Sequence, residues 1–596
     1  MGKNRTRHKR KRFFWGAVGL LLALIIGCGL VYAAEEELPS RIEWDYNAER
    51  NSFTVYNAAE VFPEAETVRC IMGFYEESGR MLFSAAAVQS GAGEMEVQCP
   101  AAKLPLPCTV RMCFLSGDYA PLGEAEVYQL SSTEPTCTKN GYLVAEREDG
   151  SDSKVLQVYK APGHSIRETV LQAPPDDVTC GTVKRWCENC SFAEQVPVYP
   201  ECDIARLCLY GDLTGIGKKA EVPVTVTFEG AGKELDCYAL LKYQGHTSLI
   251  YDKKNYTLKL FKDAAFEQKN KIVFFDWNKE HKYILKANYI DPSVCRNLVC
   301  ADIWSEMVAC RENYPAHLAD SSNFGATDGF PMALYLNDTY QGLYTFTLHR
   351  DDDLFDMEDG NLDGILVTNT AQTDAAYFRA PATFDDQSDW EVEYTGLEDD
   401  SLWLEQKLNT LIDFVQTSSD EEFREDLDEY LDVNSAIDYL IAIYSLGLTN
   451  SGAKNITMAT YDDGVLFFSL CDMENAFGLS ATGEEILAPE EVLPVCTDGV
   501  WDSATGSLLW GRLLQNYETE IRARYTELRR EILTAERICT KVSDFLQPIS
   551  EEFYAADRQI YPDMPRPTDF PQTQIEEYVP QRLSLLDGLL LSPDTE

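Results

Sequence analysis

The stretch Asn450–Gly478, which reads NSGAKNITMATYDDGVLFFSLCDMENAFG, decides the fold of the chain. A helix is predicted to end just before it. Asn434-Ser435 offers a cap for this helix, and Gly447 supplies a stop signal. Between the two signals apolar residues recur at helical spacing, namely Ala436, Tyr439, Leu440, Ile443 and Tyr444. The sequence therefore predicts a helix that leads into a polar loop.

A hairpin is predicted after the polar loop. Residues 456–461 and 465–470 are rich in β-forming residues, and the sequence DDG between them is typical of a hairpin turn. Because a hairpin returns the chain to where it started, Asp472 is expected beside the loop that holds Asn450 and Asn455.

This layout matches the needs of phosphoryl transfer, which uses a base, an amide ligand five residues later, and a carboxylate that binds magnesium after a short hairpin. Asn455 and Asp472 are then the candidate Mg²⁺ ligands. Asn450 stands at the base position, although an amide cannot accept a proton. A structural hairpin with capping asparagines is the alternative interpretation of the same spacing.

Length and composition restrict the possible functions. The chain has 596 residues, which gives room for three or four domains, and its 45% apolar content indicates packed cores. The formal charge of −47 repels phosphate backbones, so no nucleic-acid partner is expected beyond the basic N-terminus. The oligomeric state stays open.

The N-terminus predicts export. Residues 1–12 contain seven Lys or Arg and form a basic tail expected in the cytoplasm, and residues 13–34 are apolar and long enough for a transmembrane signal anchor. A signal-peptidase site at 31–33 and a lipoprotein box at 25–28 are the alternatives. Each of the three interpretations places the bulk of the chain outside the cytoplasm, and the favoured one is a single-pass protein of the cell membrane.

Residues 40–132 predict a small β-sandwich, because β-rich runs alternate with turn signals. The β-rich runs are 68–74, 95–99, 109–114 and 125–130. This domain is expected to act as a spacer, with carbohydrate or surface binding as the alternative.

Residues 133–202 form a cysteine-rich segment with a degenerate repeat. PTCTKNGY at 135–142 is echoed by VTCGT at 178–182, and only the second copy continues to a C-x-x-C pair. The spacing resembles small cysteine-rich modules of bacterial surface proteins. Cys180, Cys187 and Cys190 are candidates for a zinc site or a disulfide, with His164 as a further ligand. Because the first copy lacks the pair, a disulfide or a vestigial module is favoured and zinc is not expected.

Residues 203–596 have mixed α and β character. The blocks YQGHTS, KKNYTLKL, KYILKANYIDPSVCRN, DGFPMALYLNDTYQGLYTF, DWEVEY, AKN, TYDDGVLFF and DMENAFG follow in this order between 243 and 478. Together they resemble the CotH family of spore-coat-type atypical protein kinases, in the branch common in Gram-positive bacteria. The overall expectation is an α+β protein, in which a CotH kinase-like domain with C-terminal helices follows the β-sandwich and the cysteine-rich segment.

The resemblance implies an ATP- and Mg²⁺-dependent kinase that phosphorylates serine on partner proteins. Asp472 then matches the magnesium aspartate and Asn455 the second metal ligand. Arg296 matches a helix-opening arginine to which the resemblance assigns no role. The residues that match the phosphate-side loop and strand are Gln244, Gly245, Thr247, Ser248, Lys254 and Lys259.

Two residues depart from the family pattern. Asn450 replaces the catalytic aspartate, and Glu474 replaces the second aspartate of a D-x-D pair, where it can still ligate a cation. The expected function is therefore a serine kinase, or a weakened pseudokinase, that acts on surface or spore-coat proteins. The alternative is a non-catalytic surface module that binds a protein or a glycan.

Overall fold

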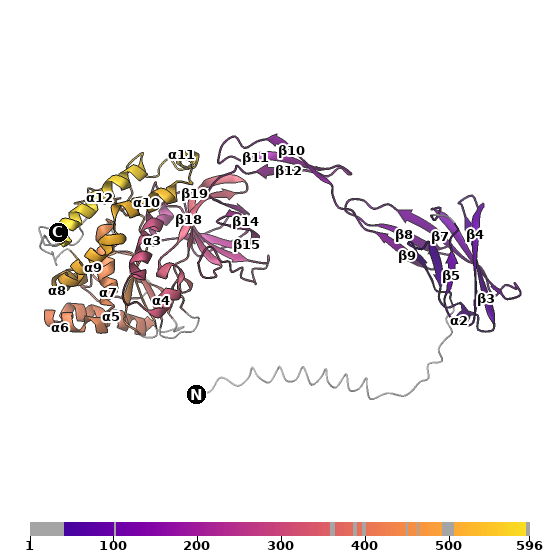
Figure 1. Ribbon diagram of the computed structural model, residues 1–596, viewed down its shortest axis with the longest axis horizontal. Helices are drawn as coiled ribbons and strands as arrows, with labels where there is room; N and C mark the ends of the chain where they lie inside the picture. The colour runs from indigo at the N-terminus through magenta and orange to yellow at the C-terminus, as the bar shows by residue number, and fades with distance from the viewer. Residues whose placement is uncertain are drawn as a thin grey trace, which may run out of the picture. The chain divides into compact units, whose positions relative to one another are not determined.

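The computed structural model describes residues 41–100, 103–357, 364–384, 390–395, 401–448, 451–461, 464–490 and 506–591 (Figure 1). The chain divides into two compact units, and the protein is of the α+β class. The first unit comprises Met1–Glu168 with Arg185–Glu194, and the second comprises Thr169–Lys184 with Gln195–Glu596. No helix within the described ranges has the length and apolarity to cross a bilayer, and the predicted anchor at 13–34 lies outside those ranges.

Two antiparallel sheets pack around one apolar core in the first unit. The core includes Phe53 from the smaller sheet and Phe74 from the larger one, with ring centroids 5.7 Å apart. The smaller sheet has the order β1 (Trp44–Asn47), β2 (Ser52–Val55), β5 (Met95–Gln98), and a short helix α2 (Ala58–Val61) follows β2. The larger sheet has the order β4 (Met81–Ser90), β3 (Thr67–Tyr75), β6 (Cys108–Ser116), β7 (Glu126–Thr133), β8 (Gly141–Arg147), β9 (Ser153–Tyr159), so it continues into the cysteine-rich segment.

A third sheet, β10 (Ile166–Gln172), β11 (Gly181–Cys187), β12 (Ala193–Val198), completes that segment. The internal repeat has a structural basis here. A Cβ on Gly141 would lie 2.3 Å from the backbone oxygen of Thr133, and a Cβ on Gly181 would lie 2.4 Å from that of Gln172. Both copies of the repeat therefore need glycine at the same close approach of two backbones.

A closed barrel of seven strands lies in the second unit. Its order is β13 (Ala205–Tyr210), β14 (Val222–Gly230), β15 (Lys233–Gln244), β16 (Asn255–Phe261), β17 (Lys282–Lys286), β19 (Thr339–Leu348), β18 (Gly329–Leu336). Strands β18 and β19 form a hairpin, and both of its turn residues, Asn337 and Asp338, have positive φ. Closure of the barrel leaves no unpaired edge strand.

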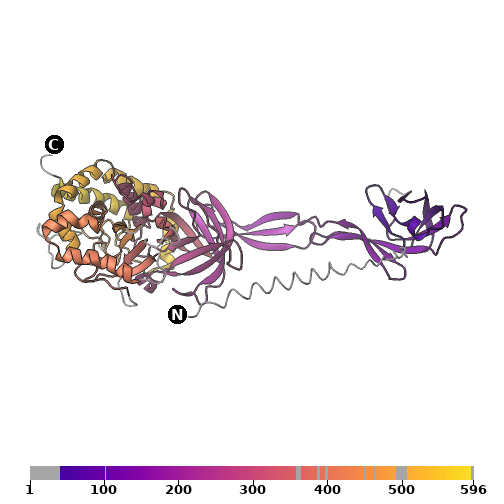
Figure 2. The ribbon, with the colours of Figure 1, turned by 90° about the horizontal axis from the view of Figure 1, so that it is seen from below.

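Helices and a four-stranded sheet follow or interrupt the barrel strands in the second unit. Figure 2 shows them on one side of this unit and the barrel strands on the other. The sheet order is β21 (Trp390–Thr395), β20 (Ile365–Asn369), β22 (Ile456–Thr460), β23 (Phe467–Leu470). The helices are α3 (Arg296–Ala309), α4 (Ala316–Asp320), α5 (Ser401–Thr417), α6 (Asp420–Asp426), α7 (Val433–Ser445), α8 (Leu508–Asn516), α9 (Glu518–Glu531), α10 (Ala535–Leu546), α11 (Glu551–Ile560) and α12 (Pro571–Leu590).

The helix and the hairpin predicted around the polar loop are α7 and β22–β23. The pairing of Ile456 with Leu470 confirms the hairpin, while the aspartates of its DDG turn lie outside the described residues. The predicted cap of α7 is wrong, because the side chain of Asp432 accepts the bond from the Ser435 N–H at 3.0 Å. The Ser435 hydroxyl instead accepts from the Phe468 N–H at 3.1 Å and ties the helix to β23.

Candidate active site

A cleft of about 530 Å³ lies in the second unit, between the barrel and the sheet that contains β22 and β23. Its volume is in the range of small-molecule sites. The polar residues on its wall come from strand ends and from the loops that follow them. They include Lys242, Gln244, Gly245, Thr247, Ser248, Lys282, Lys286, Asn455, Asp472 and Glu474.

Lys286, the last residue of β17, lies between two carboxylates. Its Nζ is 2.8 Å from Asp472 Oδ1 and 2.7 Å from Glu474 Oε1. The Asp472 side chain is 42% exposed, whereas those of Lys286 and Glu474 are 16% and 14% exposed. Both carboxylates line the cleft, and Asp472 is the more exposed of the two.

The charges of these three side chains depend on one another. Burial alone would lower the pKa of Lys286, but the two carboxylates outweigh burial and raise it. Burial favours protonation of Asp472, yet the Lys286 ammonium outweighs this and lowers the pKa of that carboxyl. Burial raises the pKa of Glu474. Asp472 is thus the carboxylate that is most firmly held in its ionised form.

Asn455 and Asp472 contact each other at the open end of the β22–β23 hairpin, as the sequence predicts. The Asn455 side-chain amide donates to Asp472 Oδ2 at 3.3 Å. Both residues have left-handed backbones, with φ of 61° for Asn455 and 53° for Asp472. Asn and Asp adopt this conformation more readily than other residues with side chains, and such positions often occur at functional sites.

The loop after Asp472 is held by two residues at the start of α3. The Met473 N–H donates to Asn297 Oδ1 at 2.8 Å, and Arg296 Nε donates to the Ala476 oxygen at 3.0 Å. The Arg296 side chain is fully buried and forms an ion pair with Asp291, which is equally buried. Arg296, to which the sequence assigned no role, is therefore a positioning residue for the carboxylate loop.

The turn after β15 forms another part of the cleft wall. Gly245 has φ of 105°, and a Cβ there would lie 2.0 Å from Ser248 Oγ. Asn255 links the turn to the strand that carries Lys286, because its Nδ2 donates to Ser248 Oγ at 3.3 Å and its Oδ1 accepts from the Ala287 N–H at 2.6 Å. Gln244, Gly245, Thr247 and Ser248, all named from the sequence, line the cleft together.

Two lysines named from the sequence have other contacts. Lys254 Nζ donates to the Leu249 oxygen at 2.7 Å and to the Tyr251 oxygen, and Lys259 pairs with Glu221 at 2.6 Å. Neither is among the described residues that line the cleft. Sequence reasoning missed Lys286, although its place at the end of the strand KYILK and before the ANYID loop was a usable signal.

The remaining sequence candidates fall elsewhere. Asn450, at the base position, lies outside the described residues. Cys187 and Cys190 lie together in the first unit with Cys137 and His164, and Cys180 is not part of this group. Burial raises the pKa of the Cys180 thiol to about 11.

The donor set of the cleft fits magnesium and phosphate. Two carboxylates and an amide offer the oxygen ligands that Mg²⁺ prefers, and the lysines supply positive charge for phosphate oxygens. A kinase-like site needs these donor groups.

Comparison with known families gives the same class. Residues 241–586 match the CotH kinase protein family, which is more than half of the 596 residues. The chain therefore belongs to the CotH kinase protein family. None of the curated proteins compared with the chain matches it.

Proposed function

We propose that this protein is an ATP- and Mg²⁺-dependent serine protein kinase with a weakened catalytic step. The observation that carries the proposal is the contact of Lys286 with Asp472 and Glu474 beside Asn455, in a chain of the CotH kinase protein family. Asp472, Glu474 and Asn455 hold Mg²⁺ in this proposal, and bound Mg²⁺ neutralises the charge that develops on the transferred phosphoryl group.

The other residues of the cleft bind and orient the nucleotide in this proposal. Lys286, Lys242 and Lys282 supply positive charge to the phosphates, and the turn from Gln244 to Ser248 covers them. Arg296 and Asn297 keep the Asp472 backbone in place through their bonds to the following residues. The chemistry then rests mainly on position and charge, which is how phosphoryl transfer is generally catalysed.

The substrate and location belong to the same proposal. We infer a protein substrate on the cell surface or spore coat, because the resemblance implies it and because residues 13–34 have the apolar length of a membrane anchor. The Gram-positive branch of the family is proposed on the same sequence blocks. A non-catalytic surface module is the second candidate, and Asn450 at the base position is the observation that favours it.

The variant Asn450→Asp distinguishes a weakened kinase from a non-catalytic module. Restoring a general base is expected to raise phosphate transfer from radiolabelled Mg-ATP to a serine-rich peptide by roughly 10²- to 10⁴-fold. The full-length chain is assayed with the double variant Asn450→Asp, Asp472→Asn as the control, which is expected to transfer no phosphate. If Asn450→Asp transfers no phosphate although the chain still binds Mg-ATP, the result would contradict the weakened-kinase proposal and favour the non-catalytic module.

Gly245→Ala is expected to weaken Mg-ATP binding. The added Cβ would lie 2.0 Å from Ser248 Oγ, and the φ of 105° disfavours any side chain. A strain of about 1–3 kcal/mol at this turn corresponds to a dissociation constant roughly 5- to 150-fold higher, measured by isothermal titration calorimetry. Gly217→Ala is the matched control, because its Cβ meets Ala220 at an ordinary 3.7 Å. Equal affinities for the two variants would exclude the turn from nucleotide binding.

A further inference from the structure

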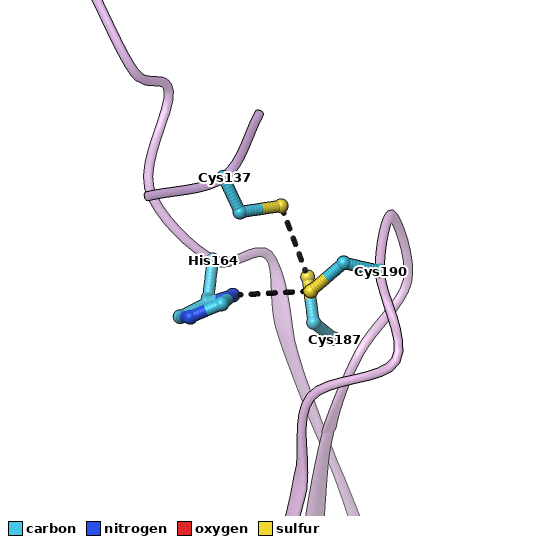
Figure 3. A group of neighbouring side chains, drawn as sticks. All are labelled: Cys137, His164, Cys187 and Cys190. Atoms are coloured by element: carbon cyan, nitrogen blue, oxygen red, sulfur yellow. Dashed lines mark hydrogen bonds between the residues drawn. The ribbon is translucent and has the colours of Figure 1, made fainter. Parts of the chain in front are cut away.

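Four side chains of the first unit gather outside the kinase-like cleft (Figure 3). They are Cys137, His164, Cys187 and Cys190, and their four ligand atoms all lie within 4.8 Å of one another. The Sγ atoms of Cys137 and Cys187 are 3.7 Å apart, and Cys190 Sγ is 3.4 Å from His164 Nδ1. Cys137 and Cys187 are buried, while Cys190 is exposed at the surface.

We propose that these four residues bind one structural zinc ion. Zinc takes thiolates at about 2.3 Å and imidazole nitrogen at about 2.0–2.1 Å in a tetrahedron, which puts neighbouring ligand atoms roughly 3.5–3.8 Å apart. The distances of 3.7 Å between two sulfurs and 3.4 Å between sulfur and nitrogen agree with that geometry. Three thiolates and one imidazole form a closed site of the structural type.

The backbone around the C-x-x-C pair is arranged for thiolates. The Asn189 N–H donates to Cys187 Sγ, and the Phe192 N–H donates to Cys190 Sγ, each at 3.4 Å. Each sulfur therefore accepts a bond from the residue two positions later in the chain. Hydrogen bonds of this kind favour the negatively charged sulfur and orient it, as outer-shell contacts do at metal sites.

His164 is held against the same turn. Its ring stacks on Phe192, with centroids 4.4 Å apart and planes at 21°. The next residue, Ser165, accepts the Glu188 N–H on its backbone oxygen at 3.1 Å and donates its hydroxyl to Glu188 at 2.9 Å. The position of the imidazole is thus fixed by the residues that lie between and after the two cysteines.

Cys137 supplies the ligand that the sequence assigned to Cys180. It comes from the first copy of the repeat, in the connection between β7 and β8, whereas the C-x-x-C pair belongs to the second copy. The two incomplete copies therefore share one complete ligand set. The expectation that zinc is absent rested on a partial set, and the structure supplies the missing ligand.

A metal ion is needed here because the segment has little core of its own. Every residue of β10 is exposed, and the buried residues of β11 are Gly181, Val183 and Cys187. Small β-rich segments with so little apolar burial are commonly stabilised by a metal ion or by disulfides. A disulfide between Cys137 and Cys187 would use two of the four side chains and leave Cys190 and His164 unexplained, whereas zinc uses all four.

Metal content of the purified full-length chain tests the proposal. After expression with zinc chloride and dialysis against metal-free buffer, mass spectrometry is expected to find about one zinc per chain. Cys187→Ser and Cys190→Ser are expected to lower this to well below half. Cys180→Ser is the matched control and is expected to keep the zinc, because Cys180 is outside the group.

The variant His164→Cys distinguishes the loss of a zinc ligand from misfolding. It replaces the imidazole with a fourth thiolate, so the variant is expected to keep the metal. In the cobalt-substituted protein its sulfur-to-metal charge-transfer band is expected to grow by about one third, from three thiolates to four. The proposal is overturned by a metal-free wild type whose peptide map shows a disulfide between Cys137 and Cys187. It is also overturned if Cys187→Ser retains full zinc, or if His164→Cys leaves the charge-transfer band unchanged.

Discussion

Asp472→Asn is expected to remove the stabilisation of this protein by Mg-ATP. A ligand present at 100 times its dissociation constant stabilises the folded state by about 2.7 kcal/mol, which appears as a higher midpoint of thermal unfolding. Asp472 is the more exposed of the two carboxylates beside Lys286, and its replacement by an amide removes the charge that binds the cation. The variant is therefore expected to show a shift close to zero at millimolar Mg-ATP.

The matched control is Asp302→Asn, which makes the same chemical change in a half-exposed ion pair with Lys541, away from the cleft lining. It is expected to keep the full Mg-ATP shift. A shift that survives in Asp472→Asn would show that this carboxylate is not a metal ligand. Absence of a shift in the wild type at millimolar nucleotide would favour the non-catalytic module instead.

Asp557→Ala is expected to destabilise the second unit by about 3–5 kcal/mol, because it leaves a buried ammonium without its counter-charge. Lys253 is fully buried, and its Nζ lies 2.8 Å from Asp557 Oδ2 and 2.6 Å from the Leu343 oxygen. The other carboxylate oxygen of Asp557 accepts the Leu343 N–H at 3.1 Å. The measurement is the urea midpoint of the unfolding transition of this unit.

The control for this buried pair is Glu221→Gln, which breaks the partly exposed pair of Glu221 with Lys259. Such pairs contribute about 0–1 kcal/mol, so a small change in the midpoint is expected. A further variant, Lys253→Met with Asp557→Leu, removes both charges and is expected to recover most of the loss. Equal losses in the double variant and in Asp557→Ala would show that packing, and not the unpaired charge, causes the effect.

The sequence predicted the elements whose contacts are made between residues close together in the chain. The helix before the polar loop, the hairpin from Ile456 to Leu470 and the contact of Asn455 with Asp472 all arise within some forty residues. These parts of the fold need no knowledge of distant partners.

Side chains whose partners lie far along the chain could not be assigned from the sequence. Lys259 pairs with Glu221 and does not line the cleft, whereas Lys286 contacts the carboxylates because β17 ends next to the loop after β23. The same limit applies to Cys137, which joins a C-x-x-C pair that lies about fifty residues later in the chain. In each case the contact joins residues that are far apart in the chain, so no local pattern in the sequence indicates it.

The contact of α12 with the carboxylate loop has a consequence for biosynthesis. Gln574 accepts from Arg296 at 2.7 Å and donates to the Phe477 oxygen at 3.0 Å, so α12 completes the support of the loop that carries Asp472. Chains emerge from the ribosome N-terminus first, and their early parts fold before the later ones. The barrel therefore precedes the finished cleft, and in a nascent chain the carboxylate loop lacks its contact with Gln574 until α12 has been translated.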